Sequence, residues 1–107
     1  MPLLQELERP IDEAIVNGLI EATPDWWRAA VLEIAWSQNE NGLEGFLHTI
    51  SSPEGHRDLV QTTDAIHEAT FKLSDLFRQH GKQWKKVIYS IRQKEDGNWT
   101  YQADFSY

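Results

Sequence analysis

The sequence has 107 residues, which is enough for one hydrophobic core and too few for two. Its 40% hydrophobic and 25% charged residues are typical of a globular domain and exclude an intrinsically disordered chain. The lack of cysteine excludes disulfides, thiolate zinc sites and cysteine nucleophiles, and the net charge of −7 argues against direct nucleic-acid binding.

The first element is expected to be a helix over residues 3–22. Apolar residues such as Ile11 and Ile15 recur at the spacing of one helix face. Pro10 interrupts this pattern, because proline removes a backbone donor and clashes with the preceding turn. The helix therefore either kinks there or restarts with Pro10 in its first turn. Pro24 ends the element, since it disfavours helical backbone at the residue before it.

Residues 28–37 and 43–50 follow the two-residue alternation of strands, and the polar turn between them contains Gly42. Their short separation predicts a hairpin. Trp26 and Trp27 precede the first of these strands. We expect one indole to pack beneath the sheet and the other to be exposed, where it becomes a candidate anchor for a protein partner.

A second helix is expected over residues 64–80, where apolar side chains return to helical spacing. Thr63 or Asp64 can cap its first turn. Gly81 can end it, because glycine adopts the left-handed conformation without strain.

Residues 84–94 and 99–105 predict two further strands, and the Asp96–Gly97 dipeptide between them is a strong hairpin signal. The element order is then α-β-β-α-β-β. It predicts a single α+β domain over residues 1–107, in which a four-stranded antiparallel sheet carries both helices on one face.

The residues that could support catalysis lack the patterns that catalysis needs. The four histidines have no metal-ligand spacing, and His67–Glu68 lacks a second histidine one turn away. The pairs Asp12–Glu13 and Glu95–Asp96 are expected to face water, where nothing shifts a carboxyl pKa towards a catalytic value. The chain also has no nucleophile elbow and no glycine-rich phosphate loop. The sequence therefore predicts no catalytic residue, no metal and no cofactor.

Trp84 lies among Lys82, Lys85 and Lys86, an arrangement that could form a small nucleic-acid patch. The alternative is a solvated strand entry with Trp84 in the core. The acidity of the whole chain favours the second interpretation.

Several spaced aromatics and turns form a pattern of their own. They are Pro24-Asp25-Trp26 before the first strand, Gly42 in the first hairpin, Trp84-Lys85 at the third strand, and Asp96-Gly97-Asn98-Trp99 before the last. With the element order, this pattern resembles the YezG family of bacterial immunity proteins over most of the chain. The resemblance implies a cytoplasmic protein that binds a toxin domain, often a nuclease, and blocks it. It also implies framework roles for Asp25, Trp26, Trp84, Gly97 and Trp99.

The candidate partner-binding residues are acids on the first helix and around the first hairpin, because they would complement the basic face of a nuclease. They are Glu6, Asp12, Glu13, Glu21, Glu40 and Glu44. The N-terminal residues lack the pattern of a signal peptide, and no apolar run approaches the roughly 20 residues that span a bilayer. We therefore expect a cytoplasmic protein that binds neither membranes nor nucleic acid directly.

Two other functions remain open from the sequence. The first is a non-catalytic adaptor or complex subunit, which could pair an exposed edge strand near residues 43–50 with a strand of its partner. The second is a small enzyme that uses His48 or His67 together with a carboxylate.

Overall fold

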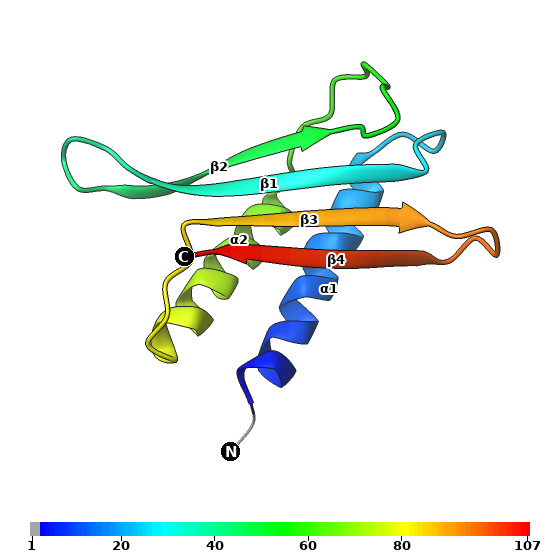
Figure 1. The fold of residues 1–107 in the computed structure, drawn as a ribbon. Helices are drawn as coiled ribbons and strands as arrows, with labels where there is room; N and C mark the ends of the chain where they lie inside the picture. The colour runs from blue at the N-terminus through cyan, green and yellow to red at the C-terminus, as the bar shows by residue number, and fades with distance from the viewer. Residues whose placement is uncertain (1–2) are drawn as a thin grey trace.

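The computed structural model describes residues 3–107 and confirms the predicted element order. Figure 1 shows two helices, α1 (Leu4–Ala22) and α2 (Asp64–Gln79), packed on one side of a sheet. The four strands are β1 (Ala29–Gln38), β2 (Glu44–Ser51), β3 (Lys86–Gln93) and β4 (Trp99–Ser106). Within the described part of the chain, neither helix combines the length and apolar character needed to cross a membrane.

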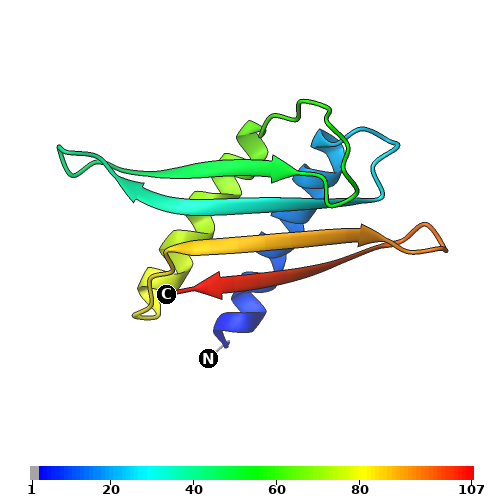
Figure 2. The same ribbon diagram turned by 45° about the horizontal axis from the view of Figure 1, so that its top comes forward.

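The sheet has the strand order β2-β1-β3-β4, and every neighbouring pair is antiparallel. The two hairpins, β1–β2 and β3–β4, are joined by pairing between β1 and β3, so β2 and β4 form the edges. In Figures 1 and 2 both helices lie on the same face of this sheet, and neither covers the opposite face. The predicted α+β fold is therefore confirmed.

Helix α1 runs without interruption from Leu4 to Ala22 and contains Pro10. Of the two alternatives that the sequence left open, a restart at this residue is therefore excluded. An internal proline costs about 3 kcal/mol, but the same helix buries Ile15, Val16 and Leu19 in the core. Each such side chain contributes roughly 1.5–3 kcal/mol on burial, so tertiary packing outweighs the local penalty.

The two helices approach each other closely at Gly18 of α1. A Cβ atom at this position would lie 2.8 Å from Cγ1 of Ile66 on α2, which is closer than carbon atoms can pack. Thr63 caps α2 by accepting a hydrogen bond from the backbone N–H of Ile66 at 3.3 Å. Gly81 follows the helix with a φ of 73°, as its predicted role at the helix end requires.

The core lies between the helices and the inward face of the sheet. Its strand residues include Leu32, Ile34 and Val87, which are all fully buried. Trp84 is 2% exposed, so its predicted place in the core is confirmed. Strand β3 nevertheless begins two residues after Trp84, at Lys86.

Candidate partner-binding surface

Five of the six acids predicted to bind a partner are exposed to solvent. Glu6, Glu13 and Glu21 lie on α1, Glu40 lies in the β1–β2 turn, and Glu44 begins β2. Two of them are paired within the chain, since Glu13 lies 3.7 Å from Arg9 and Glu44 lies 2.5 Å from Arg78.

These exposed acids do not form one cluster. Strand β1 begins next to the end of α1 that carries Glu21 and runs to the turn with Glu40 at the far end of the sheet (Figure 1). A partner that contacts both groups would have to span the length of the sheet.

The prediction that Asp12 faces water and binds a partner is wrong. Its side chain is only 4% exposed and cannot do either. The Tyr89 hydroxyl on β3 donates to Oδ1 of Asp12 at 2.5 Å. Asp12 precedes Ile15 and Leu19 by one and two helical turns, and this spacing places it on the buried face of α1. That spacing is visible in the sequence and is the signal that the prediction overlooked.

Glu8 lies one turn before Asp12 and shares its environment. Partial burial raises the pKa of Glu8 to about 8, and the hydrogen bond and negative charge of Asp12 add to this effect. Burial also raises the pKa of Tyr89, with the charge of Asp12 as the second cause. The three residues form a polar group between α1 and the sheet.

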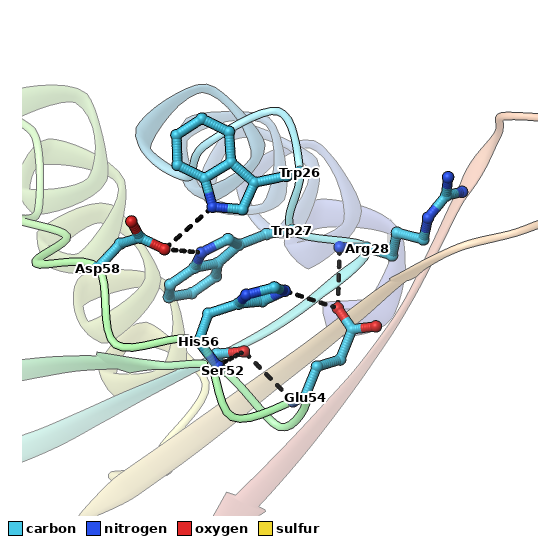
Figure 3. A network of polar contacts seen from close by, with 7 residues as sticks. All are labelled: Trp26, Trp27, Arg28, Ser52, Glu54, His56 and Asp58. Carbon is cyan, nitrogen blue, oxygen red and sulfur yellow. Dashed lines mark hydrogen bonds and ion pairs between the residues drawn. The ribbon is translucent and has the colours of Figure 1, made fainter.

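The two neighbouring tryptophans before β1 differ in solvent exposure, as the sequence predicted. Trp27 is 2% exposed, whereas Trp26 is 62% exposed. Figure 3 shows that both indoles point towards Asp58, in the loop between β2 and α2. Their Nε1–H groups donate to the same atom, Oδ2 of Asp58, at 3.0 Å and 2.9 Å. These hydrogen bonds lower the pKa of Asp58, with that from Trp27 as the larger cause.

The loop that carries Asp58 is itself held by further polar contacts (Figure 3). The His56 ring stacks on Trp27, with ring centroids 5.8 Å apart. Glu54 accepts a hydrogen bond from the backbone N–H of Arg28 at 3.0 Å and lies 3.8 Å from Nε2 of His56. Ser52 accepts from the backbone N–H groups of Glu54 and His56. This network ties the loop to the start of β1 and fixes Asp58 beneath the exposed indole.

Trp26 is thus an exposed aromatic side chain whose position is already ordered. The resemblance to the YezG family implied a framework role for it, but its ring lies at the surface. An exposed tryptophan that is held before binding loses little conformational entropy on association, and tryptophan is enriched among the residues that dominate interface energies. Leu59, which follows Asp58, is 99% exposed and adds a second apolar side chain in this loop. Sequence reasoning found the tryptophan pair but not Asp58 or Leu59, because nothing in a loop sequence indicates which distant side chain it will meet.

His48 and His67 lie side by side between β2 and α2, with ring centroids 4.4 Å apart. Nε2 of His48 lies 2.9 Å from the Thr70 hydroxyl, which itself donates to the Ile66 carbonyl. Nε2 of His67 lies 2.7 Å from the hydroxyl of Thr62. Burial, and then the proximity of His67, lower the pKa of His48 to about 4.

This arrangement does not supply the histidine–carboxylate pair that a small enzyme would use, since both imidazoles bond to threonine hydroxyls. Within residues 3–107, no group of three histidine or carboxylate side chains is placed to hold a metal ion. A shallow concavity of about 410 Å³ on the helix-free face of the sheet is lined by residues such as Arg92, Thr100 and Gln102, and by no carboxylate or imidazole.

No protein-family model matches this sequence, and no curated protein matches it significantly. A proposal about its function therefore rests on its own surface. The relevant features are the fixed indole of Trp26, the exposed acids and the uncovered parts of the sheet.

Proposed function

We propose that this chain is an immunity protein, which binds and neutralises a cognate bacterial toxin domain in the cytoplasm. The single observation that carries the proposal is the exposed Trp26 indole, held in place by Asp58 at 3.0 Å. Such a side chain offers a large apolar contact at low entropic cost, and it has no partner of its own in the core.

The charge of the chain supports the nature of the partner. The net charge of −7 favours association with a basic surface. Asp25 lies next to Trp26 in the chain, and Glu21 lies in the last turn of α1 just before it. A nuclease domain fits these features, because its substrate-binding face must be basic to hold nucleic acid.

The resemblance to the YezG family supports neutralisation as the outcome of this binding. In that interpretation Trp26 anchors the complex. The encounter is steered by the exposed acids, which are Glu6, Glu13, Glu21, Glu40 and Glu44. A tight complex at or beside the basic face would block the substrate from entering.

The test begins with co-expression of this chain and the protein encoded by the adjacent gene. Rescue of growth from a toxic neighbour supports the proposal, whereas a harmless neighbour that still binds would favour the adaptor function. The affinity of the purified pair is then measured for Trp26→Ala, and we expect a loss of about 10- to 100-fold.

Tyr107→Ala is the matched control, because Tyr107 is 63% exposed and therefore similar to Trp26 in exposure. We expect it to change affinity less than about 3-fold, since most interface or surface positions contribute little. Equal effects of the two variants, or no effect of Trp26→Ala on a complex that does form, would contradict the role given to Trp26.

A further inference from the structure

Strand β2 is a free edge of the sheet. It pairs with β1 in an unbroken register from Val31↔Ser51 to Gln38↔Glu44, and none of residues 3–107 forms a strand on its other side. The backbone N–H of Trp36 donates to Lys85 towards β3, whereas that of Asn39 donates to Leu43 towards β2. Because such bonds alternate along an antiparallel strand, the N–H and C=O groups of Phe46, His48 and Ile50 point outward from the sheet.

Natural sheets protect long edges with proline, lysine or a bulge, because unpaired edges recruit other strands. Within Glu44–Ser51 the sequence has no proline, no lysine and no arginine. Its pairing with β1 also contains no bulge. The edge therefore keeps an uninterrupted row of backbone groups that can accept another strand.

Apolar side chains flank this edge on both faces of the sheet. Leu47 is 65% exposed on the helix-free face. On the helix side, Phe71 of α2 is 52% exposed and packs against Phe46 with ring centroids 5.2 Å apart. A strand added beside β2 would place alternate side chains over Leu47 and over Phe71, because successive side chains point to opposite faces.

The other edge, β4, does not offer the same surface. Its side chains on the helix-free face are all polar, namely Thr100, Gln102, Asp104 and Ser106. Gln102 and Asp104 also bond to each other at 3.2 Å. Helix α1 borders the inward side of β4, where Tyr101 contributes to a surface shared with Arg9 and Asp12.

Charge around β2 selects the kind of strand that can bind. Glu40 and Glu44 lie at one end of the edge, and Asp64 and Asp75 share a helical face with Phe71. Arg78 of α2 is paired with Glu44 at the start of β2. Basic residues in the added strand would be attracted to these acids, and a second copy of β2 carries no lysine or arginine to supply them.

We infer that the edge of β2 binds an extended segment of a partner protein, with apolar residues on the face of Leu47 and lysine or arginine on the helix side, where Asp64 and Asp75 lie on the helical face of Phe71. This inference rests on the proposed function for the identity of the partner, which is the basic toxin domain. Main-chain hydrogen bonds to Phe46, His48 and Ile50 hold the segment, and contacts with Leu47 and Phe71 select its side chains.

The first test uses the full chain and the purified toxin domain encoded by the adjacent gene. Amide hydrogen exchange is compared with and without the domain, and we expect new protection at Phe46, His48 and Ile50. Leu47→Lys should weaken binding at least 10-fold. The matched control is Gln102→Lys, which makes the same kind of change on the helix-free face of the opposite edge and should stay within 2-fold. Circular dichroism and thermal melting check that both variants remain folded.

The outcomes separate this inference from the proposed function. If the domain is bound and neutralised but the three amides stay unprotected and Leu47→Lys has no effect, the edge is not the binding site. Sedimentation that shows self-association lost in Leu47→Lys would assign the edge to a second copy and overturn the inference.

If the domain does not bind at all, the proposed function fails. Synthetic peptides then test whether the edge of β2 binds an extended strand, independently of the toxin domain. The probe is a ten-residue peptide that alternates valine and lysine. We expect it to protect the same amides at millimolar concentration, and a valine–glutamate peptide or an N-methylated version to protect them less. No protection by the valine–lysine peptide, or equal protection by all three, would overturn the inference.

Discussion

Tyr89 on β3 donates its phenolic hydrogen to Asp12 on α1 at 2.5 Å, and the two residues are 77 positions apart in the chain. This contact explains why a carboxylate can occupy the buried face of a helix, since a buried charge needs a hydrogen-bond partner. It also removes Asp12 from the partner-binding residues and gives it a role in the fold.

Tyr89→Phe should destabilise the protein by about 1–3 kcal/mol, because it removes the hydrogen bond of the Tyr89 hydroxyl to the buried carboxylate of Asp12. Chemical denaturation measures the change. Adding Asp12→Asn to Tyr89→Phe should reduce the loss, since no charge then remains buried. The control is Tyr101→Phe at a 38% exposed side chain, where we expect less than about 0.5 kcal/mol. Similar losses in the two tyrosine variants would contradict this account.

Glu8 should make stability fall as the pH rises. Its pKa in the folded protein is about 8, against an ordinary value of 4.5. Between these values the folded state holds a proton that the unfolded state has lost, so folding becomes less favourable with rising pH. Glu8→Gln removes this dependence and should stabilise the protein at pH 8 by about 1 kcal/mol, after allowance for solvent screening of a partly exposed group.

Urea denaturation of wild type and Glu8→Gln at several values between pH 5 and pH 8 checks this prediction. Glu6→Gln, an exposed position on the same helix, is the control. If Glu8→Gln and Glu6→Gln give parallel curves over this range, Glu8 does not carry the proton.

His48 should make stability fall as the pH falls, which is opposite to the effect of Glu8. Its pKa is lowered from 6.5 to about 4. Between these pH values the unfolded state therefore binds a proton that the folded state does not bind. Its contribution to stability is complete above pH 6.5 and is lost as the pH falls towards 4. We expect a loss of about 1–2 kcal/mol from this group, discounted for partial exposure.

The contributions of Glu8 and His48 partly cancel near pH 5–6, so variants are compared rather than wild type alone. His48→Gln should flatten the decline on the acid side. His80→Gln serves as the control, because His80 is exposed at the end of α2. An acid-side decline as steep in His48→Gln as in wild type would show that His48 is not its cause.

Asp58→Ala should release the two indoles that it holds. The indole Nε1–H resonances of Trp26 and Trp27 should shift, because both groups donate to Asp58. The indole resonances of Trp36 and Trp84 should stay in place, since their Nε1 atoms make no hydrogen bond among the described residues. Nitrogen–proton correlation spectra measure this directly, and the variant should also bind a partner more weakly because Trp26 is no longer ordered.

A pH titration gives an independent measurement of the same contact. The lowered pKa of Asp58 predicts that the resonances of Trp26 and Trp27 change with a midpoint below 3.8, the ordinary value for aspartate. A midpoint at or above that value, or shifts spread over all five tryptophans, would contradict the shared hydrogen bonds.

The elements of the fold were predictable because each follows from local periodicity. Helical spacing indicated α1 and α2, alternation indicated the strands, and the turn around Gly97, where φ is 88°, indicated the second hairpin. The local penalty of Pro10 left a kink and a restart open, and the restart is excluded because packing of the whole helix compensates for that penalty. Strand ends differed by one or two residues, since the last backbone bonds depend on the neighbouring strand.

The sequence by itself determined the element order, the placement of both helices on one face of the sheet and the expectation that one of Trp26 and Trp27 is exposed. Only the tertiary structure decided that Asp12 meets Tyr89, that Asp58 holds Trp26, and that β2 is the edge with apolar residues on both sides. The physical reason is the separation along the chain of the residues that interact. Periodicity is set by neighbours within a few residues, whereas these contacts join residues up to 77 positions apart and exist only once helices and strands have packed.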